Sequence, residues 1–244
     1  MLARIAAAAC PEREPLVVEI GPGRGALTQH LIGRADAVVA LEVDPVLIPY
    51  LRHKLRDAPN VTVVEGDVLN TDLGQWGPAV ITGNLPYYIT SPILSRVLAL
   101  GDGWRGSVFL VQKEVAERLT AAPGSRDYGY LTVQTGVYAE ARYLFTISRG
   151  AFSPPPKVES AVVRLTPRDA NETFGITDEA AFLQFASLCF RQKRKTIRNN
   201  LAPRYGRDIL DAIPSKARAE ELSIAELNGI LLKLQALEGA AAGS

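Results

Sequence analysis

The sequence predicts an α/β fold, a doubly wound and largely parallel sheet followed by a small all-α domain. Short apolar runs suited to strands alternate with helical patterns as far as Pro167, and this alternation is typical of such a sheet. The last two strands of the series are free to pair antiparallel. From about Thr177 onward the sequence has helical patterns and no convincing strand. We therefore expect one domain over residues 1–167 and a helical domain over residues 176–238.

The elements are expected in a regular order along the chain. Residues 1–9 form a helix that ends before Pro11, because proline cannot continue a helix. The run 16–20 is continuous enough in apolar residues to form a strand that is buried on both faces. Strands are expected over residues 16–20, 37–43, 61–64, 79–82, 108–111, 141–147 and 158–165. Helices of the first domain are expected over residues 1–9, 26–32, 45–56, 91–100, 113–121 and 130–138.

The composition is that of an ordinary soluble globular protein. The chain has 244 residues, of which 47% are hydrophobic and 22% are charged. It has no apolar run long enough to cross a bilayer, and its start lacks the build of a signal peptide. We therefore expect a cytoplasmic protein, a monomer, without membrane association. The two cysteines have no motif spacing and there are only two histidines, so neither a metal site nor a histidine-dependent triad is expected.

Positive charge is concentrated in one segment of the chain. The formal net charge is +1, yet residues 190–218 hold nine basic and two acidic side chains, a local charge of +7 that leaves −6 for the remainder. Such segregation favours a polyanionic partner. The basic residues singled out for nucleic-acid binding are Arg191, Lys193, Arg194, Lys195 and Arg198. A solvated helix face stays open as the alternative.

A glycine-rich loop follows the first strand, with Gly21, Gly23 and Gly25 at alternate positions after the acidic Glu19. Glycines permit a tight turn and a close backbone approach, and the amides of a following helix provide donors. Nicotinamide, flavin and S-adenosylmethionine proteins all use loops of this kind. The spacing differs from the G-x-G-x-x-G pattern, which argues against a nicotinamide cofactor.

Two acidic residues follow the next two strands. Glu42 ends the second strand about 20 residues past the loop, where a carboxylate can accept hydrogen bonds from both ribose hydroxyls of a nucleotide. Asp67 follows the third strand, where it can accept from the amino group of an adenine while Val68 contacts the ring. A solvated acid at Glu42 and an Asx-type turn at Asp67 stay open as alternatives. Together these positions outline an adenosine-shaped site.

The fourth strand leads into the segment GNLPYY at 83–88. The amide oxygen of Asn84 and the carbonyl of Leu85 can accept hydrogen bonds from an exocyclic amino group, and Tyr87 can stack on the base that carries it. An ordinary strand-to-helix turn is the alternative, since Asn and Pro are common in such turns. A nucleoside clamp followed by an amino-group clamp is the order expected of an S-adenosylmethionine-dependent amino-methyltransferase.

These motifs resemble those of the rRNA adenine N6-dimethyltransferase family. The resemblance covers nearly the whole chain and follows its order. It is carried by VEIGPG at 18–23, LEVD at 41–44, GD at 66–67, NLPY at 84–87, FSPPPKVES at 152–160 and FRQKRK at 190–195. It is nearest to the housekeeping bacterial branch, which dimethylates two adjacent adenosines near the 3′ end of small-subunit rRNA.

The resemblance implies a Rossmann-like, seven-stranded methyltransferase sheet with S-adenosylmethionine as cofactor and S-adenosylhomocysteine as product. It implies an immature small ribosomal subunit and its rRNA as partners in ribosome assembly. The cofactor contacts would come from Gly21, Gly23, Glu42, Asp67, Val68 and Asn84. Asn84 and the Leu85 carbonyl would hold the adenine amino group, while Tyr87 and Phe152 would cover the two faces of the flipped base.

The sequence departs from the family pattern at two places. Family members carry a segment with a Gln-x-Phe-Leu run ahead of the first helix, and its residues fold over the cofactor. The sequence here begins at Met1, after the place of that segment. Either it starts late or the protein lacks this cover, in which case weaker cofactor binding is expected. Tyr88 stands where many relatives have a smaller polar residue, which is expected to alter the rim of the pocket.

Two other functions stay open. One is a resistance-type methylase of large-subunit rRNA, although Leu85 and the run PPKVES favour the small-subunit branch. The other is a ribosome-assembly factor that binds precursor rRNA without methylating it. This alternative is motivated by the lack, in this sequence, of the segment that folds over the cofactor in family members.

Overall fold

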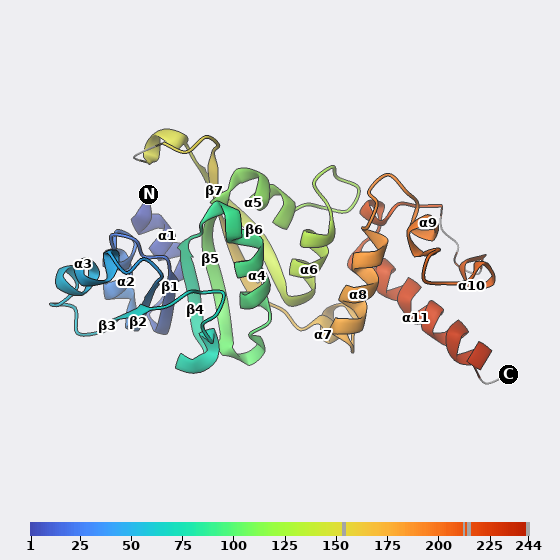
Figure 1. Cartoon of the computed structure of the whole chain (residues 1–244), viewed down its shortest axis with the longest axis horizontal. Coiled ribbons are helices and arrows are strands. Elements are labelled where there is room, and N and C mark those ends of the chain that lie inside the picture. The colour runs from blue at the N-terminus through green and yellow to red at the C-terminus, as the bar shows by residue number, and fades with distance from the viewer. Residues whose placement is uncertain (153–154, 212, 214–215, 243–244) are drawn as a thin grey trace. The chain divides into compact units, whose positions relative to one another are not determined.

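The computed structural model describes residues 1–152, 155–211, 213 and 216–242, and Figure 1 shows their course. The chain forms two compact units. The first consists of residues 1–116 and 140–167, and the second of residues 117–139 and the chain from 168 onward. Segment 117–139, which we expected in the first domain, thus groups with the C-terminal helices.

A seven-stranded sheet has the order β3-β2-β1-β4-β5-β7-β6. Its strands are β1 (Glu14–Ile20), β2 (Ala35–Glu42), β3 (Val61–Glu65), β4 (Ala79–Asn84), β5 (Trp104–Gln112), β6 (Ala139–Ile147) and β7 (Ser160–Pro167). The first five strands pair in parallel, whereas β7 pairs antiparallel with β5. The predicted fold class is confirmed.

Strand β1 lies near the middle of the sheet, and Val17, Val18 and Ile20 are almost completely buried. This agrees with the prediction of a strand covered on both faces. Gly83 of β4 lies opposite Ile20. A Cβ atom at position 83 would lie 2.4 Å from the Ile20 carbonyl oxygen, so glycine is what allows the two strands to approach this closely at their carboxyl ends.

Helices cover the sheet. Those in this part of the chain are α1 (Leu2–Ala9), α2 (Thr28–Leu31), α3 (Leu47–Lys54), α4 (Thr90–Leu98) and α5 (Lys113–Leu119). Helix α1 packs against β4, β5 and β7, and α4 packs against β5, in front of the sheet in Figure 1. Under α1 lies an apolar core that contains Ile5, Leu31, Val38 and Leu110.

Two local differences from the sequence-based expectation bear on the site. The helix expected over 26–32 is only α2 and a short 3₁₀ turn (Ile32–Arg34), because the turns of the glycine loop continue through Leu27. Strand β4 continues through Asn84, because Gly83 and Asn84 pair with Phe109 and Leu110 of β5. Asn84 is therefore the last residue of a strand instead of a loop residue, which places it on a more rigid element.

The second unit is helical. Its helices are α6 (Tyr130–Tyr138), α7 (Ala170–Phe174), α8 (Glu179–Cys189), α9 (Ile197–Leu201), α10 (Arg207–Asp211) and α11 (Ile224–Ala242). Asp178 accepts from the Ala181 amide at the start of α8, and Thr196 does the same for the Asn199 amide at the start of α9. Phe182, Cys189 and Leu227 belong to a separate apolar core. None of the helices in the described part of the chain is both long and apolar enough to span a membrane.

Candidate active site

The glycine loop joins β1 to α2 and is held by hydrogen bonds to the end of β2. Gly21, Gly23 and Gly25 have φ angles of +63°, +59° and +70°, a region that side chains with a Cβ atom rarely adopt. The Gly21 amide donates to the Leu41 carbonyl of β2 at 3.0 Å. A Cβ atom at Gly21 or Gly23 would meet nothing within 4 Å. The loop is therefore set by its backbone conformation and faces open space.

Glu42 lies beneath this loop. Its Oε2 accepts a hydrogen bond from the Gly23 amide at 2.9 Å, and its Oε1 accepts from the Val43 and Asp44 amides at 2.9 and 3.0 Å. The side chain is buried, which excludes the alternative interpretation of Glu42 as a solvated acid at the end of the strand. A carboxylate oxygen has two lone pairs, so Oε2 retains room for one further donor such as a hydroxyl.

Glu19 is a second buried carboxyl group at the same edge of the sheet. Its Oε2 accepts from the Thr28 hydroxyl at 2.6 Å. Removal from water is the main cause that raises the pKa of Glu19 to about 7; the Thr28 hydrogen bond opposes this shift and the negative charge of Glu42 adds to it. No role of Glu19 was predicted from the sequence. Its position within a continuously buried strand was the available signal, because an acid there must be buried as well.

Asp67 lies directly past the end of β3 and shapes its own turn. Its Oδ1 accepts from the Leu69 amide and its Oδ2 from the Asn70 side chain, each at 2.8 Å. The Asx-type turn that stood as the alternative is thus present. The Gly66 amide donates to the Glu42 carbonyl at 2.8 Å, so the turn of Asp67 and the carboxylate of Glu42 lie at neighbouring strand ends. Val68 is buried.

Asn84 and Leu85 mark the end of β4. Asn84 is exposed and its side chain makes no hydrogen bond to the described residues, whereas Leu85 is buried and its amide donates to the Leu110 carbonyl at 3.0 Å. Because Ile20 and Gly83 are partners in the β1–β4 pair, the residues that follow them, Gly21 and Asn84, come at the same edge of the sheet. The structure therefore brings the glycine loop and the predicted amino-group clamp together.

The two predicted stacking residues have different surroundings. The Tyr87 hydroxyl lies 2.7 Å from the Ser160 hydroxyl at the start of β7, while Tyr88 is 86% exposed. Phe152 follows a 3₁₀ turn (Arg149–Ala151) and packs, partly buried, against the core under α1. Ser153 and Pro154 of the same motif lie outside the described residues.

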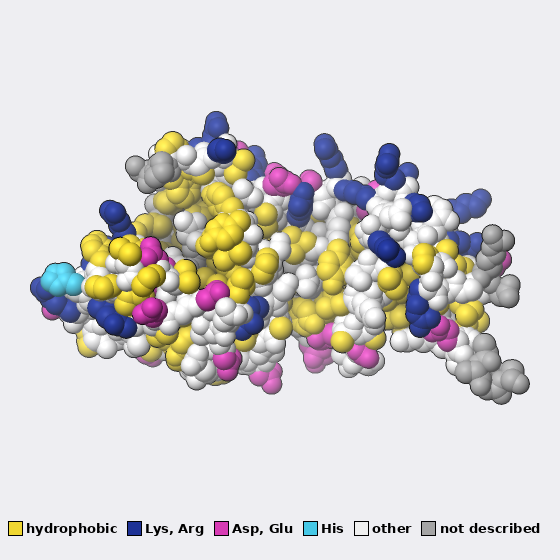
Figure 2. All heavy atoms as spheres, in the orientation of Figure 1, with side chains coloured by type: hydrophobic (Ala, Val, Ile, Leu, Met, Phe, Trp, Pro, Cys, Tyr) yellow, Lys and Arg dark blue, Asp and Glu magenta, His cyan; other side chains and the backbone are white. Residues whose placement is uncertain are grey.

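The basic residues lie in the second unit, and Figure 2 shows Lys and Arg side chains over its helices. Arg191, Lys193, Arg194 and Lys195 are exposed. The loop that carries them is held by the buried Asn200, whose side chain bonds the Cys189 and Gln192 carbonyls and the Gln192 amide.

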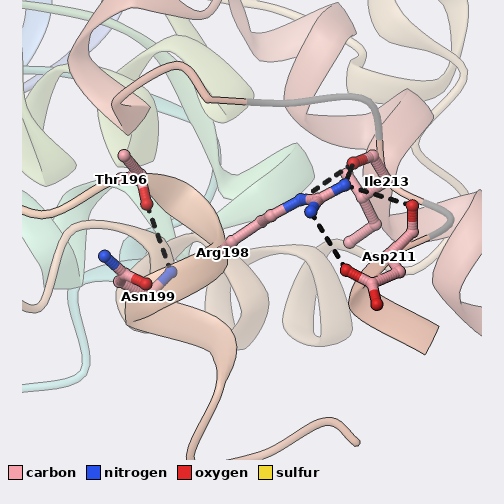
Figure 3. A network of polar contacts seen from close by, with 5 residues as sticks. All are labelled: Thr196, Arg198, Asn199, Asp211 and Ile213. Atoms are coloured by element: carbon pink, nitrogen blue, oxygen red, sulfur yellow. Dashed lines mark hydrogen bonds and ion pairs between the residues drawn. The ribbon is translucent and has the colours of Figure 1, made fainter. Parts of the chain in front are cut away.

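Arg198 has an internal role that sequence reasoning missed. Its guanidinium donates to the Ile213 and Asp211 carbonyls and to the Asp211 carboxylate, the last at 3.2 Å (Figure 3). A basic residue in a basic run suggests a phosphate contact. Here the guanidinium instead fixes the end of α10, and no sequence signal pairs positions 198 and 213.

The family model described as "Ribosomal RNA adenine dimethylase" matches residues 1–235. The chain belongs to this family. It is 42% identical over 215 residues to ribosomal RNA small subunit methyltransferase A of Chlorobium chlorochromatii, covering 86% of this chain and 80% of that protein. It is also 42% identical over 230 residues to the protein of the same name from Acidobacterium capsulatum, covering 90% and 81%.

Two solved structures are similar to this chain over nearly its whole length. The chain is similar to the 23S rRNA methyltransferase ErmE, with a TM-score of 0.75, 30% identity and coverage of 96% of both chains. It is similar in fold to a dimethyladenosine transferase from Plasmodium falciparum, with a TM-score of 0.80 and 24% identity over 96% of this chain and 95% of that one.

For a member of the rRNA adenine dimethylase family, the groups at this sheet edge fit an adenosine-containing cofactor. Open space lies in front of Gly21 and Gly23, and the buried carboxylate of Glu42 supports the loop from below. The exposed side chain of Asn84, which bonds none of the described residues, follows Gly83 at the same sheet edge. A nucleoside with a cationic sulfonium suits a site that holds the carboxyl groups of Glu19 and Glu42.

Proposed function

We propose that this protein is an S-adenosylmethionine-dependent methyltransferase that dimethylates N6 of two adjacent adenosines near the 3′ end of small-subunit rRNA during ribosome assembly. Its enzyme class follows from its family. The small-subunit assignment rests on relatives 42% identical to this chain that are named for that subunit. The cytoplasm, where ribosomes are assembled in bacteria, is the expected compartment.

The observation that supports the proposal is the pairing of Ile20 with Gly83 across β1 and β4, because Gly21 and Asn84 are the residues that directly follow this pair. This pairing brings the glycine loop to the same sheet edge as Asn84, whose side-chain amide makes no hydrogen bond to the described residues. S-adenosylmethionine, when bound, supplies a methyl group to a nucleophilic nitrogen and leaves as S-adenosylhomocysteine. Gly21, Gly23, Glu42, Asp67 and Val68 are the residues proposed to hold it, together with Asn84.

At the target adenine, the protein has to orient the exocyclic amino group, which is a weak nucleophile. The lone pair of an adenine amino group is delocalised into the ring. Hydrogen bonds from this group to the Asn84 amide oxygen and the Leu85 carbonyl favour a pyramidal nitrogen and hold it in position for attack. No strong general base is needed, because the nitrogen becomes acidic once it carries the new bond. Tyr87 and Phe152 are proposed to stack on the flipped base, which favours single-stranded or loop RNA.

The exposed cations of the second unit are proposed to bind rRNA phosphates. Arg191, Lys193, Arg194 and Lys195 supply positive charge on a loop held by Asn200. Because the guanidinium of Arg198 is engaged inside the unit, we assign it the lesser part in this contact.

The proposal is tested with S-adenosylmethionine labelled in its methyl group. Small ribosomal subunits from a strain that lacks the modification are the substrate, and large subunits are the control. We expect label in dimethyladenosine of the small-subunit rRNA and none in the large subunit. Label confined to large subunits would contradict the small-subunit assignment. Tight binding to small subunits without transfer would instead indicate a non-catalytic assembly factor.

A further inference from the structure

One hydrogen bond joins the motif at the end of β4 to the start of β7. The Tyr87 hydroxyl and the Ser160 Oγ lie 2.7 Å apart, although 73 positions separate the two residues. Ser160 is fully buried and Tyr87 is partly buried. Within the described residues this is the only side-chain hydrogen bond that either hydroxyl makes. A buried hydroxyl without a partner is costly, so the two groups depend on each other.

The sheet topology explains how they meet. Strand β5 lies between β4 and β7. The Leu85 amide bonds the Leu110 carbonyl on one side of β5, and Ser160 pairs with Gln112 on the other side. Tyr87 must therefore reach across the carboxyl end of β5, and the Ser160 hydroxyl anchors the far end of its side chain.

We propose that Ser160 is a positioning residue that fixes the Tyr87 ring for the target base, an inference that rests on the proposed function. Stacking does not require the hydroxyl, because a phenylalanine ring offers the same face. The hydroxyl acts on orientation: it restrains the ring before the base arrives, which reduces the ordering required on binding and sets the height of the base relative to Asn84.

The same bond joins Tyr87 to the strand that follows the segment of Phe152, the second aromatic residue proposed to flank the base. Phe152 lies on the segment that leads into β7, and Ser160 is the first residue of that strand. The Lys113 amide bonds the Glu159 carbonyl at 3.0 Å, so the end of this segment is also held to the chain directly after β5. Ser160 thereby ties the position of Tyr87 to the end of the segment that carries Phe152.

The test compares Ser160→Ala, Tyr87→Phe and the double variant with a matched control, Ser107→Ala. Ser107 is also a buried serine of this sheet whose hydroxyl bonds an aromatic side chain, the Trp104 indole at 2.8 Å, but it lies near the start of β5. Single-turnover and steady-state methyl transfer to unmodified small subunits gives kcat and KM, and thermal melting gives stability.

We expect Ser160→Ala and Tyr87→Phe each to lower kcat about five- to tenfold with KM for the subunit changed less than about twofold, since one neutral hydrogen bond is removed. The double variant should lose no more than either single one. Ser107→Ala should keep the kcat of the unmodified protein. Equal kcat for Ser160→Ala and Ser107→Ala, or a loss in the double variant equal to the product of the two single losses, would overturn the inference.

A second measurement does not depend on turnover. An RNA hairpin with 2-aminopurine in place of the target adenosine reports stacking, because its fluorescence is quenched on an aromatic ring. At saturating protein, we expect brighter fluorescence with Ser160→Ala than with Ser107→Ala, and the brightest with Tyr87→Ala. If the unmodified protein transfers no methyl group, the proposed function fails, and this comparison still decides the role of Ser160: identical fluorescence for the two serine variants would refute it.

Discussion

The backbone amide of Gly23 donates a hydrogen bond of 2.9 Å to the Oε2 of Glu42. This bond joins the loop after β1 to the end of β2, and the other oxygen of the same carboxylate holds the Val43 and Asp44 amides. Glu42 thus organises the backbone around the proposed cofactor site, besides offering an acceptor to a ribose. Loss of the Glu42 carboxylate should weaken cofactor binding by loosening this backbone and by removing the acceptor for the ribose.

We expect Glu42→Gln to weaken binding of S-adenosylmethionine about 10- to 100-fold, because the neutral amide replaces a charged acceptor of backbone hydrogen bonds. Isothermal titration calorimetry measures the dissociation constant. Glu65→Gln is the control, since Glu65 is the exposed partner of Glu42 in the β2–β3 register. Equal affinities of the two variants for S-adenosylmethionine would show that Glu42 does not contribute to cofactor binding.

The buried Glu19 makes stability depend on pH. Its pKa is about 7 in the folded protein, against an ordinary value of 4.5. The folded state therefore holds the proton more tightly, and the free energy of unfolding should fall as pH rises from 4.5 to 7. The whole effect is about 3 kcal/mol.

Glu19→Gln should remove this dependence while its amide oxygen still accepts from Thr28. The stability difference between the variant and the unmodified protein should grow by about 2–3 kcal/mol between pH 5 and pH 8, in favour of the variant. Urea unfolding at the two pH values measures it, with Glu65→Gln again as the exposed control. A difference that stays constant with pH would mean that Glu19 titrates normally.

Gly83→Ala should destabilise the sheet. The added Cβ atom would lie 2.4 Å from the Ile20 carbonyl oxygen, so β1 and β4 must move apart, at a cost of about 1–3 kcal/mol or more. Gly33→Ala is the matched control, because a Cβ atom there meets nothing within 4 Å. Urea unfolding measures the stability of both variants. Equal urea midpoints would show that β1 and β4 accommodate the Cβ atom without loss of stability.

Reversing the charge of Arg194 and Lys195 together should weaken binding to small subunits and make it less dependent on salt. Each phosphate that the protein no longer neutralises lowers the slope of log affinity against log salt by about one, so a decrease of about two is expected. The control reverses Arg52 and Arg56, two exposed cations of the first unit. Filter binding across a salt series gives both slopes, and equal slopes for the two double variants would exclude the basic segment as the RNA-binding surface.

The sequence could predict the parts of the site that depend on strand ends. Because parallel strands place their carboxyl ends at one edge, Gly21, Glu42, Asp67 and Asn84 could be assigned to the same edge without coordinates. Their detailed bonding could not be assigned. The three amides held by Glu42 depend on the exact conformations of the glycine loop after β1 and of the turn after β2.

Side-chain pairs between residues far apart in the sequence could not be predicted, for a different reason. The Tyr87–Ser160 bond depends on the antiparallel register of β5 and β7, and residue types alone do not fix that register. Arg198 shows the reverse case: its charge suggested RNA, but the end of α10 happens to supply acceptors within its reach.

The most direct test of the account is methyl transfer by Asn84→Ala to unmodified small subunits, measured beside subunit binding. Asn84 is exposed and its side chain bonds none of the described residues, so the variant should fold normally. We expect kcat to fall at least about 100-fold while the dissociation constant for the subunit stays unchanged. Near-full turnover by Asn84→Ala would contradict the assignment of the site.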